Sequence, residues 1–397
     1  MLQTRLAKIA RLAGLACVFL ASAVAPPVSE ATPQFAREHQ LRCTACHLLP
    51  PKLNEEGLAF QASGYVLPEQ LRLQRRVEAP GFATLPFAAW LSGRFEDQGS
   101  GGTNDLLLPK VELISGGTLG EQWSYFAEWR IVSLSLNADG SLKDRGGRFE
   151  DLFIQRNIGT RHALKVGQFR SLNQVDVSLR LSPSEPLLFK NGLRTDSDPD
   201  SRINSLLRFS PASRSPSIGY SFRSIEGRSA SDGLFHFVTL PFVGELSIPL
   251  SSEASQNASF ELQGPPKGVF LETFYRSGQK SVGGHFFYDD DAWLGTVLGT
   301  YDWRSILVTA GLGADQDHGV SRTRSSLEVE YLLTGKSDLR AAAGFRIEDV
   351  SDDDRRAAYV PYFVLAGPNT QHTYLLQLQY KDQQGSDTVV VDLSMLF

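Results

Sequence analysis

Residues 373–382 read TYLLQLQYKD, and their side chains alternate between two faces. One face is apolar or aromatic, and the other is polar: Tyr374, Leu376, Leu378 and Tyr380 against Gln377, Gln379 and Lys381. Successive side chains of a β-strand point to opposite sides, so a period of two is typical of a strand with one apolar face. The stretch therefore predicts an amphipathic strand.

The same period recurs from about residue 85 to the C-terminus, for example in residues 123–131, 326–333 and 339–348. Aromatic residues recur on the apolar faces, as interfacial girdles require: Trp123, Trp129, Tyr331, Tyr374 and Tyr380. The last nine residues, VVVDLSMLF, also alternate and end on Phe397. We predict an antiparallel transmembrane β-barrel of about 16 strands, because single-chain bacterial barrels have even strand numbers.

Alternation alone does not separate this barrel from a soluble periplasmic β-sandwich or propeller, which is the alternative. The aromatic residues, the segments of about ten residues and the last strand favour the barrel. After the N-terminal segment there is no apolar run of about 18 residues that could form a transmembrane helix. Polar stretches are expected to form loops, Asp315–Ser321 among them.

The N-terminus predicts export. Arg5, Lys8 and Arg11 precede an apolar run, residues 12–25, and Ser29-Glu30-Ala31 is a small-x-small cleavage site. We predict a secretory signal peptide over residues 1–31, with an uncleaved membrane anchor as the alternative. Cleavage removes three of the 39 basic and one of the 44 acidic residues, which leaves a formal charge of −7. A net negative chain argues against nucleic acid as a partner.

Cleavage also removes Cys17, so that only Cys43 and Cys46 remain, in the run Cys43-Thr44-Ala45-Cys46-His47. A C-x-x-C-H sequence indicates covalent attachment of one haem c. The two thiols reach the two vinyl groups of one porphyrin, and His47 becomes the proximal ligand of the iron. A disulfide in a tight loop and a zinc half-site are the alternatives.

The sixth iron ligand stays open. The chain has two methionines, Met1 in the signal peptide and Met395 near the C-terminus, so methionine ligation is not expected. His39 is the nearest candidate for a distal ligand, and a solvated side chain is the equal alternative. Lys52, Asn54 or a water are further options.

A short helix is expected after the motif, with Asn54 as its N-cap and acidic residues in its first turn. Leu58, Phe60 and Tyr65 are expected to cover the porphyrin, because a segment of about 50 residues builds a poor core alone. The predicted organisation is thus a signal peptide over 1–31, a monohaem cytochrome segment over 32–80 and the barrel over 85–397.

The N-terminal residues resemble the cytochrome segment of fused monohaem cytochrome–porin proteins, best known as outer-membrane iron oxidases. The matching residues are Pro33, Phe35-Ala36-Arg37, Cys43–His47, Pro51-x-Leu53-Asn54, Gly57, Phe60 and Gly64-Tyr65. The resemblance implies electron transfer in the bacterial outer membrane, from an extracellular donor such as Fe(II) to a periplasmic c-type cytochrome or similar acceptor. Iron:cytochrome oxidoreduction is the enzymatic form of that activity, and no separate catalytic residue is assigned.

The motif and the barrel together suggest a mechanism. One haem cannot bridge an apolar band of about 25 Å from one side, but a barrel could hold it in the polar lumen, within reach of both faces. A different class of function stays open: a solute or anion porin whose haem segment acts as a plug or as a redox or gas sensor. Arg130, Arg340 and Arg346, which we expect to face the lumen, suit that alternative.

Overall fold

The computed structural model describes residues 34–35, 45–66, 87–97, 104–136, 142–144, 146–174, 181, 188, 214–225, 232–247, 259–263, 268–289, 292–317, 320–333, 340–351, 356–367, 373–383 and 386–396. The predicted signal peptide, His39 and Cys43 lie outside these residues.

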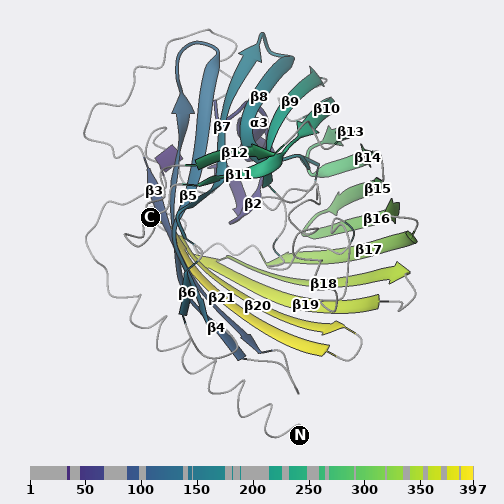
Figure 1. Cartoon of the computed structure of the whole chain (residues 1–397). Helices are drawn as coiled ribbons and strands as arrows, with labels where there is room; N and C mark the ends of the chain where they lie inside the picture. Colours follow the sequence, from purple (N-terminus) through teal and green to yellow (C-terminus); the bar gives the residue numbers. More distant parts are fainter. Residues whose placement is uncertain are drawn as a thin grey trace, which may run out of the picture. The chain divides into compact units, whose positions relative to one another are not determined.

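Within the described residues, sixteen antiparallel strands close into a barrel (Figure 1). They are β3 (Ala88–Asp97), β4 (Asn104–Thr118), β5 (Trp123–Leu136), β7 (Arg148–Ile158), β8 (His162–Arg170), β9 (Arg214–Ile225), β10 (Gly233–Pro241), β13 (Val269–Ser277), β14 (Lys280–Tyr288), β15 (Ala292–Trp303), β16 (Ile306–Asp317), β17 (Val320–Leu333), β18 (Arg340–Ser351), β19 (Arg356–Gly367), β20 (Thr373–Gln383) and β21 (Ser386–Leu396). The last strand pairs with the first, from Val389 opposite Asp97 to Leu396 opposite Trp90, which closes the ring. The predicted barrel and its strand number are confirmed.

Six short elements of the described residues lie outside this ring of strands. β6 (Leu142–Asp144) pairs with β5, and β11 (Val243–Ser247) pairs with β12 (Ser259–Gln263) as an excursion between β10 and β13. Near the N-terminus, β1 (His47–Leu49) pairs with β2 (Lys52–Leu53), and α3 (Glu55–Ala62) follows. The expected helix after the haem motif is therefore present.

The expected loop over Asp315–Ser321 is wrong in part. β16 extends to Asp317 and β17 begins at Val320, so most of this polar stretch is strand. The reason is that charged side chains of a strand can face the barrel lumen. The Asp315 carboxylate is buried there and pairs with Arg324 on the neighbouring strand at 2.5 Å. Polar composition here marks the inner face of a strand and not a turn.

The polarity of the barrel is inverted relative to a soluble protein. Val297 and Leu312 lie opposite each other on β15 and β16, and 64% and 68% of their surfaces are exposed. On the inner side, Arg346 and Glu348 of β18 are buried. An apolar exterior around a charged interior suits lipid outside and excludes the soluble alternative. The protein is an integral protein of the bacterial outer membrane.

Among the described residues, no helix has the length and apolar character needed to cross a membrane.

A charge on the lipid face tests this orientation. Replacing Val297 with arginine, midway along β15, should lower the free energy of unfolding by about 2–4 kcal/mol, because the guanidinium meets hydrocarbon. The same replacement of Trp303, at the end of β15, should cost only about 0–1 kcal/mol near the interface. Urea unfolding in lipid vesicles measures both values, and equal costs at the two positions would contradict the assigned depth.

The two ends of the barrel differ in their connections. Turns of residues 159–161, 278–279 and 304–305 lie at one end, where β3 begins and β21 ends. The connections over residues 171–213 and 242–268 belong to the other end. Outer-membrane barrels have short periplasmic turns and longer extracellular loops. The end opposite the two long connections therefore faces the periplasm.

Candidate functional site

The second half of the C-x-x-C-H motif is hydrogen-bonded to the start of α3. The Asn54 backbone N–H donates to the Cys46 carbonyl at 2.9 Å, and its side-chain amide donates to the Ala45 carbonyl at 3.0 Å. The Asn54 side-chain oxygen accepts from the Gly57 N–H at 3.0 Å, as an N-cap does. This one residue therefore caps the helix and fixes the motif against it.

His47 is oriented through its ring. The Nδ1 atom lies 3.1 Å from the Pro51 carbonyl oxygen, to which it donates, so Nε2 is the nitrogen left to coordinate a metal. Enclosure within the protein lowers the pKa of the His47 imidazole to about 4, and the ring is neutral at pH 7, as a metal ligand must be. The described residues of the motif therefore fit a proximal haem ligand.

Gly57 lets α3 approach the motif. A Cβ atom at this position would lie 2.1 Å from the Cys46 carbonyl oxygen and 2.8 Å from Leu53 Cδ2. No side chain fits there unless the helix moves away from the motif. The close approach of α3 to Cys46 therefore requires a glycine three residues after the N-cap Asn54.

We expect Gly57→Ala to move α3 away from the Cys46 backbone and to reduce the yield of protein with covalently attached haem several-fold. Haem staining of denatured protein, normalised to total barrel, measures the yield. Gly93→Ala is the matched control, because a Cβ on β3 at Gly93 meets no atom within 4 Å. If both variants retain haem equally, the close approach at Gly57 does not matter for attachment.

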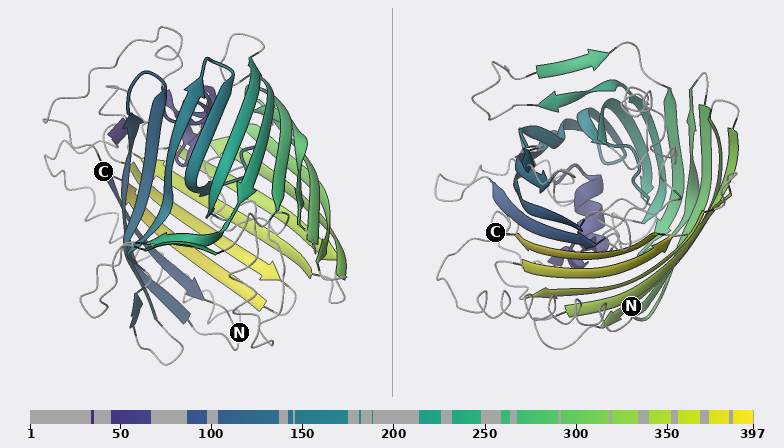
Figure 2. Two further views of the ribbon diagram at one scale, coloured as in Figure 1. Left: turned by 45° about the horizontal axis from the view of Figure 1, so that its top comes forward. Right: turned by 60° about the horizontal axis from the view of Figure 1, so that its bottom comes forward.

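Residues 45–66, which we call the lumen segment, lie inside the ring of strands (Figure 2). Lys52 forms an ion pair with Glu330 of β17, and Arg340 of β18 donates to the carbonyl of Leu48. The Gln279 side chain donates to the Leu53 carbonyl at 3.4 Å. All these partners belong to the ends of strands or turns on the periplasmic side. The lumen segment therefore occupies the periplasmic end of the lumen.

The Lys52 ion pair is part of a buried cluster. Only 2% of the Lys52 surface is exposed, and the Glu330 side chain is almost as enclosed. The Tyr362 hydroxyl lies 2.7 Å from Glu328 Oε1 and 2.9 Å from Glu330 Oε1, and donates to one of the two. Lys52 thus places a positive charge of the lumen segment beside two carboxylates of the barrel wall, Glu328 and Glu330.

The other end of the lumen segment is held by polar contacts. The Ser63 carbonyl accepts from the Asn157 side chain at 3.1 Å, and the Ser63 hydroxyl from Arg223 at 3.2 Å. Gly64 then adopts a positive φ of 72°, which ends α3 and brings the backbone against Ser124 and Gln155 of the wall. The lumen segment is therefore attached to opposite sides of the barrel.

Aromatic side chains fill the space between the lumen segment and β5. Phe35 stacks on Tyr65 with 5.3 Å between ring centroids, and Tyr65 stacks on Phe126 at 4.4 Å. Phe60 packs edge-on against Phe35 at 5.0 Å. Phe60 and Tyr65 were expected to cover a porphyrin, and in this structure they pack among protein side chains, Phe126 of the wall included.

The three arginines that the sequence assigns to the lumen do face it, but with partners. Arg130 pairs with Glu112 at 2.9 Å and with Glu150 at 2.8 Å. Arg346 lies 3.2 Å from Glu348 and 3.7 Å from Glu328. Arg340 donates to the lumen segment as described above. Carboxylates of the barrel wall thus neutralise the charges of Arg130 and Arg346, which reduces the positive charge available to attract an anion in the lumen.

Sequence reasoning missed a second ionic cluster on the wall. Arg214 of β9 reaches Glu128 at 2.9 Å and Asp151 at 2.9 Å, and also pairs with Glu150. The alternation predicts that such residues face inward. It does not predict their partners, because these residues belong to strands far apart in the sequence.

Sequence reasoning also missed the chain segment after β8, which enters the lumen from the extracellular end. After β8, the backbone N–H groups of Asn173 and Gln174 donate to the Glu272 carboxylate, at 2.9 and 2.8 Å for the shorter contacts. Further along, Leu181 is buried in an apolar cluster with Leu49 of the lumen segment. The described parts of this connection therefore line the lumen.

Comparisons with known proteins concern the barrel. No family model and no curated protein matches the chain. Among solved structures, it is similar to OmpF of Salmonella typhi in complex with daunomycin, with 12% identity over 78% of this chain and 97% of that chain and a TM-score of 0.49. It is also similar to a loop-deletion mutant of OmpT from Vibrio cholerae (10% identity, 78% and 98% covered, TM-score 0.45).

A BenF-like porin from Pseudomonas fluorescens Pf-5 is similar at 9% identity, with 79% of this chain and 97% of that chain covered and a TM-score of 0.44.

Proposed function

We propose that this protein transfers electrons across the outer membrane through one haem c bound to Cys43, Cys46 and His47. An extracellular donor, for which the family resemblance suggests Fe(II), loses one electron, and a periplasmic c-type cytochrome or similar acceptor gains it. The observation that carries the proposal is His47 of the C-x-x-C-H sequence, whose ring is oriented by the Pro51 carbonyl inside a closed transmembrane barrel. A haem bound here supplies one-electron exchange at its iron.

The chain's own residues would give this exchange a fixed geometry. Pro51 sets which nitrogen of His47 is available, and Asn54 holds the Cys46 backbone against α3. The Lys52–Glu330 ion pair ties the segment to the wall. A barrel around the site limits water access, and water access is one of the factors that set the reduction potential of a bound metal.

Because the lumen segment lies at the periplasmic end of the lumen, the electron donor and the electron acceptor would reach it by different routes. Glu330 lies near the end of β17 and Arg340 at the start of β18, both on the periplasmic side. A protein acceptor in the periplasm can therefore approach the segment from its own side. The donor has to be small, because it must enter the lumen from the extracellular end.

Vesicles test the proposal. The purified protein is inserted into lipid vesicles that contain a soluble c-type cytochrome, and Fe(II) is added outside. We expect reduction of the internal cytochrome, seen by its absorption, at a rate proportional to the protein inserted. A colourless protein, or a rate equal to that of protein-free vesicles, contradicts the proposal.

A solute or anion pore closed by the lumen segment is the second candidate. The observation that favours it is the size of the ring, since sixteen-stranded porins leave an aqueous channel. Conductance across planar bilayers separates the two functions. A steady ion current through the wild-type protein supports the pore, and a closed barrel with haem-dependent electron transfer supports the conduit.

A further inference from the structure

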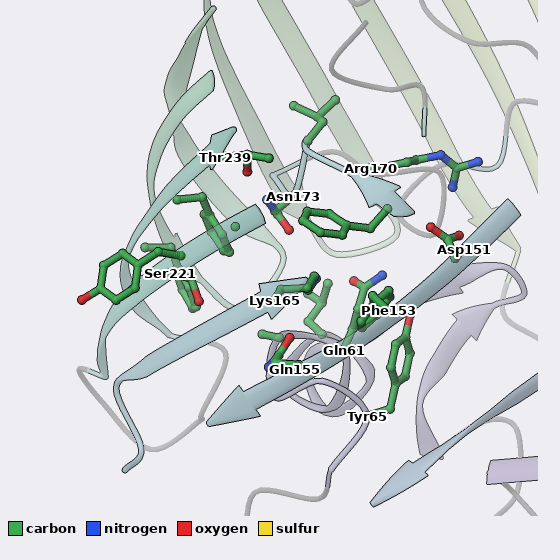
Figure 3. A pocket seen from close by; sticks show the side chains of 18 of the residues that line it. Gln61, Tyr65, Asp151, Phe153, Gln155, Lys165, Arg170, Asn173, Ser221 and Thr239 are labelled. Atoms are coloured by element: carbon green, nitrogen blue, oxygen red, sulfur yellow. The ribbon is translucent and has the colours of Figure 1, made fainter. Parts of the chain in front are cut away.

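The barrel wall is hollowed on both of its sides. On the lumen side, a cavity beside α3 is lined by Gln61 and Tyr65 of the lumen segment and by Phe153 and Lys165 of the wall (Figure 3). That cavity belongs to the packing of the lumen segment against the wall. On the lipid side, a groove crosses β13 to β16, which are neighbours in the ring (Figure 1). This second hollow, which we call the outer groove, faces the membrane.

The outer groove is bordered by large apolar side chains with small residues between them. Each of the four strands contributes one large side chain, and all four are exposed: Leu271, Phe286, Val297 and Leu312. The small residues are Gly284, Gly295 and Ala314. An exposed apolar groove of this kind on a protein surface marks a place of contact with a membrane or a ligand. In this position it suits a hydrocarbon chain.

Two aromatic rings with two cations lie on the same strands, at their periplasmic end. Tyr301 and Trp303 of β15 face the lipid, and more than half of the surface of each is exposed. Lys280 Nζ lies 4.8 Å from the Tyr301 ring centroid, and the Arg304 guanidinium lies 5.4 Å from that of Trp303. Residues two apart in a strand are about 7 Å apart on one face. Stacking on the rings therefore holds two cations within reach of one headgroup.

The carboxylates nearby do not neutralise these cations. Asp302 lies between the two rings in the sequence, so its side chain has the opposite facing, and its charge acts on Glu55 of α3 inside the barrel. The charge of Asp232 acts on Glu55 as well. Within the described part of the chain, neither Lys280 nor Arg304 forms an ion pair. Both are therefore able to pair with an anion from the membrane.

The turn that carries Arg304 has a backbone that favours glycine. Arg304 has a φ of 60°, and in the turns after β7 and β13 the residues with a φ of 62° and 60° are Gly159 and Gly278. Glycine adopts this left-handed region freely, whereas a residue with a Cβ atom is disfavoured there. The turn itself therefore does not call for arginine. A contact of its guanidinium outside the turn gives a reason for this residue.

We propose that this site on the lipid face binds an anionic glycerophospholipid of the periplasmic leaflet. The lipid phosphate contacts Lys280 and Arg304, and the two rings lie at the level of the headgroup, as interfacial aromatic residues do. An acyl chain lies along the outer groove. Val297 is four residues from Tyr301 along β15, about 13 Å toward the membrane centre, which is within the length of such a chain. The proposal does not depend on the haem.

Native mass spectrometry of the detergent-solubilised full-length protein tests the site. Phosphatidylglycerol and phosphatidylcholine with the same acyl chains are added in turn, and bound lipids are counted at each concentration. We expect one phosphatidylglycerol to bind roughly tenfold or more tighter than phosphatidylcholine. The double variant Lys280→Gln/Arg304→Gln should lose that preference. Both residues lie on the surface, so the variant should fold, which the heat-dependent gel shift of the barrel checks.

Arg156→Gln is the matched control. Arg156 of β7 also lies over an aromatic ring, that of Trp123 at 5.4 Å, but neither residue lines the outer groove. This variant should keep the preference for phosphatidylglycerol. Equal binding of the two lipids by the wild type, or the same loss in Arg156→Gln as in the double variant, overturns the proposal.

Two other occupants give distinct results. Glycerol 3-phosphate has the charged group without the chains, and it should not displace bound phosphatidylglycerol. Displacement would show that a free anion is sufficient and would overturn the assignment to a lipid. A native mass of several copies that retain no phosphatidylglycerol would assign the outer groove to contact between copies of this chain, and would overturn it as well.

Discussion

Replacing Lys52 with alanine should release the lumen segment from the wall and open the barrel to ions. Without the lysine, Glu330 stays buried next to Glu328, with one Tyr362 hydroxyl between them. Breaking a buried ion pair by removing one partner costs about 3–5 kcal/mol, because the remaining charge is uncompensated. The other wall contacts of the segment given above are hydrogen bonds, including those from Arg340 and Arg223, and not ion pairs, so we expect detachment at the Lys52 side without loss of the barrel. Single-channel conductance in planar bilayers measures the opening.

Two further variants make the result specific to attachment. Lys110→Ala removes a lysine 2.7 Å from buried Glu112, but this pair lies within the wall and Glu112 keeps Arg130. Its conductance should equal that of the wild type. Lys52→Met combined with Glu330→Gln leaves neither charge buried and should close the barrel again. A single Lys52→Ala variant with wild-type conductance would show that this pair does not hold the segment.

The strands and their facing were predictable because the signal is local. In β17, Leu327, Val329 and Tyr331 are exposed while Glu328 and Glu330 are buried, as the alternation indicates. Each residue of a strand needs only its own parity to be assigned a face. The helix after the motif was predictable for the same reason, since Asn54 and its two following acids lie within one turn.

The contacts that build the site were not predictable from the sequence. Lys52 was considered as an iron ligand, and in the structure it pairs with Glu330, 278 residues away. Phe60 and Tyr65 were expected to cover a porphyrin; in the structure Tyr65 stacks on Phe126 of the wall, and Phe60 packs against Phe35 and Tyr65. Partners across a closed barrel depend on the shear and curvature of the whole ring, which no short stretch encodes.

Replacing both Cys43 and Cys46 with serine should remove covalent haem and abolish electron transfer in vesicles. A thioether needs a cysteine sulfur atom, and the double variant, unlike either single one, leaves none in the motif. The fold should survive, because the contact of Cys46 with Asn54 is made by the backbone carbonyl, which serine keeps. Haem staining after denaturation and the heat-dependent gel shift of a folded barrel measure the two properties separately.

His39→Asn is the companion variant, since it leaves both cysteines and His47 in place. It should keep covalent haem, and a changed absorption spectrum would identify His39 as the distal ligand, whereas an unchanged one would leave that position to another group. The decisive comparison remains the wild type against the double variant Cys43→Ser/Cys46→Ser. If the variant stains for haem as strongly as the wild type, or if both are colourless, Cys43-x-x-Cys46-His47 is not a haem attachment site, and the pore closed by the lumen segment becomes the better account of this barrel.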